Sequence, residues 1–338
     1  MDAAEAARNA LEYVVEAKKG DSLAIFCDDE KMDVGEPFYT GALDLGVKTH
    51  LVKLKTGPAP RKGIPSGIKE IFTRKTDIFL NLLRGNREET TFRIELTKLE
   101  TKDRNTRLAH CPGITLDMLT EGALALTADD HRRMQDFAGS LTRLLRRAHI
   151  VKVTSPAGTD LTLNVKGRLF FTDTKIDWER LSWFNMPTGE VTVAPVEDSL
   201  EGRLVCDTAI GGIGLIKDPI EITAKEGKVQ KTGCHDSQLL KRVEESLRTD
   251  SQASVVGEFA FGINPKARLI EEFLETEKIL GTAHLAFGDN SDMPGGRNIS
   301  SNHMDFLISK PTVTVVNNDD SKFDVLVDGK FKNEKIIH

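Results

Sequence analysis

The sequence contains few residues of the kinds on which many catalytic sites are built. Its 338 residues include only 8 His, 4 Cys and 2 Tyr. No two cysteines have the two-residue gap of a redox or structural zinc motif, which argues against both. A site that depends on histidine or tyrosine therefore has few candidates. The four scattered cysteines are expected to be small buried thiols: Cys27, Cys111, Cys206 and Cys234.

Long apolar runs are also missing. No run approaches the roughly 18 apolar residues of a membrane-spanning helix, and the longest, 23–27 and 78–83, have the length of strands. The first ten residues are acidic and rich in alanine, unlike the basic and apolar segments of a secretory signal. We therefore expect a cytoplasmic protein with reduced thiols and no membrane association.

Positive charge is in deficit. The net charge is −6 and the sequence pI is about 5.8, which argues against a nucleic-acid partner. Residues 1–150 carry a net charge of +1, whereas residues 151–338 carry −7. Such an acidic excess is typical of an ordinary solvated surface, and it is also what a carboxylate cluster that binds cations would produce.

The composition is that of a globular protein, with 39% hydrophobic and 29% charged residues, and the length favours two domains. Helical and strand periods alternate in the first half, which predicts a parallel α/β sheet domain (Rossmann- or flavodoxin-like) over residues 1–149. The predicted helices are 2–19, 36–45, 68–74 and 116–149, and the predicted strands are 22–27, 48–54, 77–83 and 107–110.

From residue 150 the hydrophobic period changes to two, which predicts a β-rich α+β domain over residues 150–338. The glycine-rich segment 211–214 lacks the full dinucleotide-binding fingerprint and predicts a β-turn or a bulge. One helix is predicted at 238–248, and the predicted strands are 150–154, 159–165, 191–196, 203–207, 220–223, 255–261, 283–287 and 305–309.

Four segments of the second half each offer residues that bind metals. His303 and Asp305 are two positions apart, so on a strand they share one face and can hold one ion. His284 is the polar residue of a short apolar strand. Glu258 lies in another apolar strand, where a carboxylate is costly unless it is paired or bound to metal. Glu190 begins a further strand.

Each of these residues has an ordinary explanation when it is taken alone. His303 and Asp305 match a surface pair, and His284 matches a hydrogen-bonded core histidine. The succession of four such segments favours a shared metal site over four independent coincidences.

Taken in order, residues 185–191 (NMPTGEV), 257–265 (GEFAFGINP), 284–288 (HLAFG) and 303–305 (HMD) resemble the aminopeptidase T family of metallopeptidases. The resemblance implies two divalent ions, typically cobalt or zinc, and the ligand types also suit manganese. It implies a further acidic ligand upstream of the first histidine, for which Glu277 is the nearest match and Glu275 the alternative. The implied metal ligands are Glu190, Glu258, His284, His303 and Asp305.

The resemblance implies a dinuclear aminopeptidase-like hydrolase that cleaves an N-terminal peptide bond or a small amide. Two cations lower the pKa of a shared water and polarise a carbonyl, and a nearby carboxylate accepts a proton. Glu258 and Glu277 are the candidates for that base. A homodimer is implied by the resemblance alone.

One expected group is missing. The family's peptidases carry a tyrosine shortly after the first metal-binding histidine, whereas the two tyrosines of this chain, Tyr13 and Tyr39, lie in the first half. Candidate replacements that could donate to a substrate, or simply form turns, are Asn290, Arg297 and Asn298.

Two other functions remain open from the sequence. A sister branch resembles 2,5-dihydroxypyridine dioxygenase, which uses one iron(II) held by two histidines and an aspartate. This chain shares its length and its His303-x-Asp305, but Glu258 stands where that branch has a histidine. The third alternative is a protein that binds a metal or ligand without catalysis.

Overall fold

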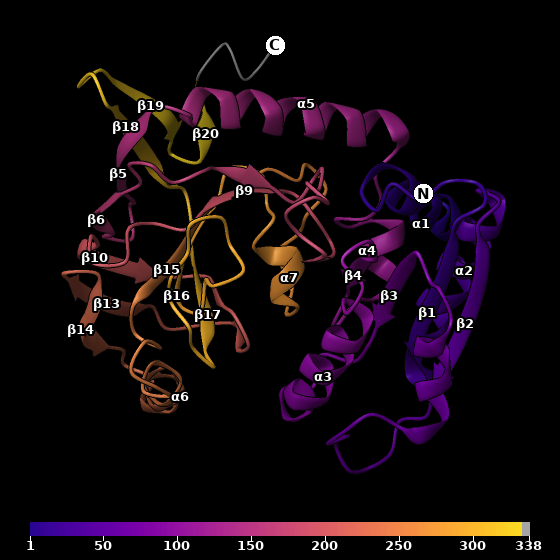
Figure 1. Ribbon diagram of the computed structural model, residues 1–338. Coiled ribbons are helices and arrows are strands. Elements are labelled where there is room, and N and C mark those ends of the chain that lie inside the picture. Colours follow the sequence, from indigo (N-terminus) through magenta and orange to yellow (C-terminus); the bar gives the residue numbers. More distant parts are fainter. Residues whose placement is uncertain (333–338) are drawn as a thin grey trace. The chain divides into compact units, whose positions relative to one another are not determined.

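The computed structural model describes residues 1–332, which form two compact units (Figure 1). Unit 1 comprises residues 1–133 and 173–188, and unit 2 comprises residues 134–172 and those from 189 onward. The domain boundary at 149/150 remains a proposal, and residues 333–338 of the second predicted domain lie outside the described part.

Unit 1 is built on a parallel sheet of five described strands in the order β2-β1-β3-β4-β8. The predicted α/β fold with an N-terminal parallel sheet is thereby confirmed. Its strands are β1 (Ser22–Asp28), β2 (Lys48–Leu54), β3 (Ile78–Leu82), β4 (Arg107–His110) and β8 (Trp183–Asn185). Its helices are α1 (Ala3–Tyr13), α2 (Met32–Asp44), α3 (Thr90–Glu100) and α4 (Leu116–Thr120), with 3-10 turns at Asp29–Lys31, Ser66–Thr73 and Arg87–Glu89.

Two of the predicted helices are shorter than their hydrophobic patterns. The helix expected at 2–19 ends at Tyr13, and Glu16 has a φ of 58°, which no right-handed helix can accommodate. The helix expected at 116–149 is divided into α4 and α5 (Ala128–Leu145). Thr127 and Asp130 form a capping pair, in which each side chain accepts a hydrogen bond from the other's backbone N–H (3.0 and 3.1 Å), and this pair begins α5.

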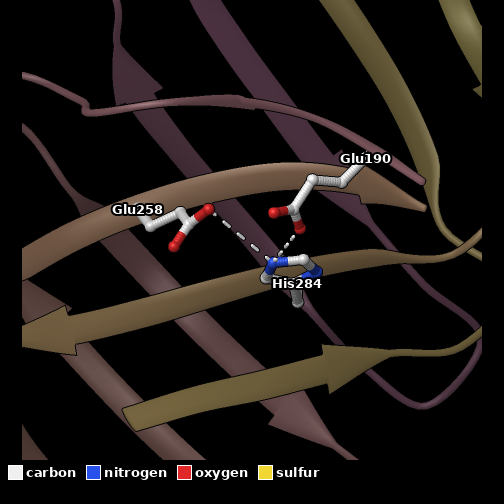
Figure 2. A group of neighbouring side chains, drawn as sticks. All are labelled: Glu190, Glu258 and His284. Carbon is white, nitrogen blue, oxygen red and sulfur yellow. Dashed lines mark ion pairs between the residues drawn. The ribbon is translucent and has the colours of Figure 1, made fainter. Parts of the chain in front are cut away.

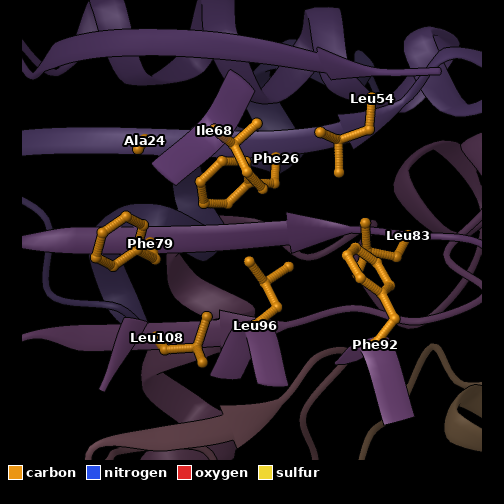
Figure 3. Packing of buried hydrophobic residues seen from close by; sticks show 9 residues of the cluster. All are labelled: Ala24, Phe26, Leu54, Ile68, Phe79, Leu83, Phe92, Leu96 and Leu108. Carbon is orange, nitrogen blue, oxygen red and sulfur yellow. The ribbon is translucent and has the colours of Figure 1, made fainter. Parts of the chain in front are cut away.

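The segment expected to form a helix at 68–74 is a 3-10 helix instead, Ser66–Thr73. Its side chains help to cover one face of the parallel sheet, together with α3 (Figure 3). Phe26 of β1 stacks on Phe79 of β3 with ring centroids 6.0 Å apart. The buried cluster comprises Ala24, Phe26, Leu54, Ile68, Phe79, Leu83, Phe92, Leu96 and Leu108.

A buried charged network lies at the carboxyl end of β1. Arg61 binds Asp28, the last residue of that strand, through both terminal nitrogens (2.5 and 2.8 Å). Arg61 and Arg84 also bind Glu89, whose side chain is 1% exposed. Burial alone would raise the pKa of Glu89, but the hydrogen bonds from Arg84 and Arg61 outweigh it and lower that pKa to about 2.

Unit 1 should therefore lose stability in acid through Glu89. A carboxyl whose pKa is depressed in the folded state stabilises the fold above its unfolded pKa, and this stabilisation is lost as the pH falls toward 2. Between pH 6 and pH 3, the free energy of unfolding should fall by about 2 kcal/mol more in the wild type than in Glu89→Gln. Urea unfolding at each pH measures this difference.

The neighbouring exposed residue provides the matched control. Glu88→Gln should keep the pH dependence of the wild type. An unchanged pH dependence in Glu89→Gln would show that the arginine network does not act through this carboxylate.

Unit 2 contains two antiparallel sheets among the described residues, as the change of period predicted. The eight-stranded sheet has the order β14-β13-β10-β6-β5-β18-β19-β20. Its strands are β5 (Ala148–Thr154), β6 (Asp160–Asn164), β10 (Glu201–Cys206), β13 (Ile220–Lys225), β14 (Lys228–Gly233), β18 (Thr312–Asn317), β19 (Lys322–Val327) and β20 (Lys330–Phe331).

The second sheet of unit 2 has seven described strands in the order β12-β11-β17-β16-β15-β9-β7. Within the glycine-rich segment 211–214, residues 211–213 form the predicted turn between β11 and β12, and Gly214 begins β12. The strands are β7 (Phe171–Thr172), β9 (Glu190–Val193), β11 (Ala209–Ile210), β12 (Gly214–Leu215), β15 (Val256–Gly262), β16 (Ala283–Gly288) and β17 (His303–Ile308). Most of α5 (Ala128–Leu145) lies in unit 2, together with α6 (Ser237–Leu247) and α7 (Phe273–Thr276).

The remaining expectations about the chain as a whole concern its thiols and membrane segments. All four cysteines lie in the described part and none forms a disulfide. Cys27, Cys111 and Cys206 are buried as expected, but Cys234 is only partly buried, so the expectation was wrong for that residue. None of the helices within residues 1–332 combines the length and the apolar character that a membrane crossing requires.

Candidate metal centre

The strand register of the seven-stranded sheet places the predicted ligands of β15 and β17 on one face. Glu258 on β15 is paired with Ala286 on β16, and Ala286 is paired in turn with Asp305 on β17. His303 is two residues before Asp305 on the same strand. Because side chains alternate between the two faces of a strand, Glu258, His303 and Asp305 project from the same face.

The same register adds the other two predicted ligands. His284 is two residues before Ala286 on β16 and therefore shares its face. Glu190 of β9 is paired with Gly262, which is four residues after Glu258 and also on that face. Five side chains that are scattered over more than a hundred residues of sequence are thereby brought to one surface of one sheet.

Figure 2 shows Glu190, Glu258 and His284 directed toward one another from three adjacent strands. Nε2 of His284 is 3.4 Å from Oε2 of Glu190 and 3.9 Å from Oε1 of Glu258. The imidazole is 1% exposed, and within the described chain its Nδ1 has no hydrogen-bond partner. His284 therefore presents Nε2 alone to the two carboxylates.

A second group lies beside the first and shares Glu258. Nε2 of His303 is 3.1 Å from Oε2 of Glu258 and 3.4 Å from Oδ1 of Asp305. The hydroxyl of Thr192 donates a hydrogen bond to Oε1, the other oxygen of the Glu258 carboxylate. The His303 side chain is 37% exposed, so this group is the one nearer to solvent.

Of the two alternatives for a further acidic ligand, Glu277 joins the cluster. It directly follows α7, is 7% exposed, and lies with His284 and Asp305 in a third group whose ligand atoms are all within 4.8 Å of one another. Glu275 instead accepts a hydrogen bond from Nε of Arg268 at 2.9 Å. The geometry therefore supports Glu277 over Glu275.

Lys278 is a charged residue of the cluster that the sequence analysis did not single out. Its Nζ is 2.7 Å from Oε1 of Glu190 and 2.8 Å from Oε1 of Glu277, and its side chain is 2% exposed. The feature of the sequence that could have indicated Lys278 is its position beside Glu277, in a stretch that leads into a fully buried strand.

The carboxylates change the proton affinity of the histidines. Burial alone would lower the pKa of His284, but its interaction with Glu258 and the charges of Glu277 and Glu190 raise it to about 9. Burial would likewise lower the pKa of His303, but Asp305 and Glu258 raise it well above its usual value. Solvent at the exposed edge of His303 screens these charges more than at His284. The electrostatic potential at the cluster is therefore strongly negative, and it attracts cations.

The two candidate bases have opposite environments. Burial alone would raise the pKa of Glu258, but contacts with His284 and His303 hold it well below its usual value. Burial raises the pKa of Glu277, and the nearby Asp305 charge raises it further, against the lowering effect of Lys278. Glu258 is thus held as a carboxylate, whereas Glu277 has the higher affinity for a proton.

The donor set fits a divalent metal ion. Two ligand atoms on one tetrahedral zinc ion are about 3.4 Å apart, given bonds of about 2.1 Å. The separations of 3.1 to 3.9 Å that join the two histidines to their carboxylates bracket this value. Mixed carboxylate and imidazole ligands suit zinc, cobalt, manganese and iron(II). Three overlapping groups of this kind could hold more than one ion.

Asn290 and Asn298 lie in the loop between β16 and β17 and use their amides to hold it in place. Nδ2 of Asn290 donates to the carbonyl of Gly257 (3.0 Å), and Nδ2 of Asn298 donates to those of Val256 (2.9 Å) and Gly288 (3.1 Å). Both residues are buried. These contacts favour the turn-forming alternative for both residues.

Arg297, the third candidate for substrate contact, is exposed on the same loop. A contact of Asn290, Arg297 or Asn298 with substrate remains a prediction.

Two solved structures have the same fold over nearly the whole chain. Wild-type AmpT from Thermus thermophilus is 18% identical, with a TM-score of 0.73, and the alignment covers 98% of this chain and 99% of AmpT. 2,5-Dihydroxypyridine dioxygenase from Pseudomonas putida KT2440 is 15% identical, with a TM-score of 0.66 and coverage of 99% and 98%. At these identities the two structures establish the fold alone.

The family assignment comes from the sequence. No curated protein matched this chain. The sequence profile described as thermophilic metalloprotease (M29) matches residues 128–331, which is more than half of the chain and includes every predicted ligand. The chain therefore belongs to the M29 family of metalloproteases.

Proposed function

We propose that this protein is a metal-dependent hydrolase that cleaves an N-terminal peptide bond or a small amide. The observation that carries the proposal is the convergence of two histidines and four carboxylates on one region of unit 2, in three overlapping groups of ligand atoms within 4.8 Å. A second support is membership of a metalloprotease family. The acidic excess of the second half also fits a centre that concentrates cations.

We propose that the centre holds two divalent ions. Glu258, His303 and Asp305 would hold one ion, and Glu190, Glu277 and His284 would hold the other. The ions would be zinc, cobalt or manganese, since the ligand types suit all three. A divalent ion bound there would lower the pKa of a water molecule and would polarise the carbonyl of the substrate.

The surrounding residues suit different tasks in such a reaction. Glu258 lies between the two histidines and accepts a hydrogen bond from the hydroxyl of Thr192. We therefore assign Glu258 to binding the metal. Glu277 is buried, and in the absence of a bound ion its pKa is raised. We therefore assign Glu277 to accepting a proton and passing it on when it is not bound to the second ion. The leaving amine requires such a proton when the C–N bond of the amide substrate breaks.

The ring-cleaving dioxygenase is the second candidate, because a solved dioxygenase has the same fold. A mononuclear iron(II) oxygenase is typically built on two histidines and one carboxylate. Each of the three ligand groups in the described chain has one histidine and two carboxylates instead. This ligand ratio favours the hydrolase.

The remaining finer proposals rest on the sequence analysis. We propose a homodimer in the cytoplasm that acts on small peptides or amides and does not bind nucleic acid or membranes. Size-exclusion chromatography with light scattering tests the homodimer.

Metal analysis together with a substrate panel tests the function. The purified protein should bind zinc, cobalt or manganese and release amines from chromogenic leucine and arginine amides. A chelator should abolish the release, and added metal should restore it. One bound iron with oxygen uptake on a hydroxypyridine would replace the hydrolase with the dioxygenase. Bound metal without turnover of either substrate class would favour a binding protein.

A further inference from the structure

Lys278 places a positive charge inside the carboxylate cluster. A lysine side chain that is 2% exposed is rare unless it is paired, and Lys278 is paired with Glu190 at 2.7 Å and Glu277 at 2.8 Å. A charged ammonium has three donors and no lone pair. It therefore cannot serve as a metal ligand, and it occupies carboxylate oxygens that would otherwise be available to one.

Both of these contacts fall on the His284 side of the cluster. Oε1 of Glu190 accepts from Lys278, while Oε2 of the same carboxylate faces His284 at 3.4 Å. Glu277 belongs to the ligand group that contains His284 and Asp305. The site that we propose for the second ion thus already contains a bound cation, because two of its three ligands contact Lys278.

The net charge of the cluster also indicates that Lys278 opposes binding of a second ion. Four carboxylates face the centre: Glu190, Glu258, Glu277 and Asp305. One divalent ion together with Lys278 leaves a single negative charge, whereas a second divalent ion makes the centre net positive. Repulsion between cations is strong in a buried environment, because little water screens it.

We propose that Lys278 competes with the second metal ion, so that the two ions bind with unequal affinity. The first ion binds tightly among Glu258, His303 and Asp305. The second binds among Glu190, Glu277 and His284 only when the Lys278 ammonium releases its two carboxylates. This proposal rests on the proposed metal centre and adds an order of loading to it.

Titration of the metal-free wild type with Co²⁺, followed by calorimetry and by metal analysis, is the first test. We expect two ions per chain with dissociation constants that differ by at least tenfold. In Lys278→Met the weaker dissociation constant should fall at least tenfold, while the tighter one changes by less than threefold. Lys241→Met removes an exposed lysine of the same unit and should leave both constants unchanged.

The melting temperature shows whether each variant is folded. If Lys278→Met does not fold, Lys278→Gln tests the same loss of charge with a polar side chain. Two wild-type ions of equal affinity would overturn the proposal, and so would a folded variant with unchanged or weaker binding of the second ion. Absence of any metal binding in the wild type would overturn the metal centre itself. The two failures are therefore distinguishable.

Discussion

Glu258→Gln is expected to lower hydrolysis of an aminoacyl amide about a thousandfold, as a loss of about 4 kcal/mol of transition-state stabilisation would. Glu258 contributes to two of the three ligand groups and lies between His284 and His303. Glutamine keeps the shape of the side chain but removes its negative charge. Initial rates measured at saturating metal, together with bound metal per chain, give the size of the effect.

Glu245→Gln is the matched control, because Glu245 lies on α6 with a side chain that is 65% exposed. It should keep the wild-type rate and metal content. A folded Glu258→Gln protein with wild-type activity would remove Glu258 from the metal centre. A protein that keeps its metal but loses its activity would instead assign Glu258 to proton transfer, the other role that the sequence left open.

Four of the five described strands of the unit 1 sheet could be predicted because they are short, mostly apolar and separated by segments that contain glycine or proline. Helix α3 could not be predicted so easily. Its buried residues Phe92, Leu96 and Glu100 have helical spacing, but β-branched residues with weak helix propensity stand between them. Packing of Phe92 and Leu96 onto the sheet provides what the local propensity lacks.

Strand β8 shows a different limit of sequence reasoning. It has three residues and joins the sheet beside β4, although more than seventy residues separate the two strands in the chain. Its pairing depends on the path of the chain through unit 2, which no local pattern encodes. The return of residues 173–188 to unit 1 therefore had to come from the structure.

The candidate site was easier to predict than its surroundings. Two histidines and three carboxylates in apolar strands are expensive to bury, and this cost marked them as a group. No comparable sequence feature indicated that Lys278 would be buried in this cluster, because lysine side chains in proteins are mostly exposed. Its place in the cluster follows from the tight packing of segment 277–282 against β15, which depends on one glycine.

Gly262→Ala is expected to destabilise unit 2 by about 3 kcal/mol, the upper range for an overpacked core. A Cβ atom at Gly262 would lie 2.9 Å from the carbonyl oxygen of Glu277 and 2.5 Å from Oγ1 of Thr282, and closer still to the carbonyl of Ile279. Real Cβ atoms essentially never come within 3.0 Å of such atoms, and two of the three belong to the backbone. The strand and the segment must therefore separate.

This separation should reach the metal centre as well as the fold. The segment that must move carries Glu277 and Lys278, and it is joined to Gly262 by backbone hydrogen bonds from Gly262 to Thr282 (3.1 Å) and from Gly281 to Gly262 (3.0 Å). Binding of the second ion should weaken more than binding of the first. Denaturant unfolding of the metal-free protein and the Co²⁺ titration measure the two effects.

Gly233→Ala provides the control, since Gly233 is also in a strand of unit 2. A Cβ atom there meets nothing within 4 Å, and the residue does not have a positive φ. The free energy of unfolding of Gly233→Ala should stay within about 0.5 kcal/mol of the wild-type value. Equal unfolding midpoints for the two alanine variants would mean that segment 277–282 yields without cost, so β15 would not hold Glu277 and Lys278 in position.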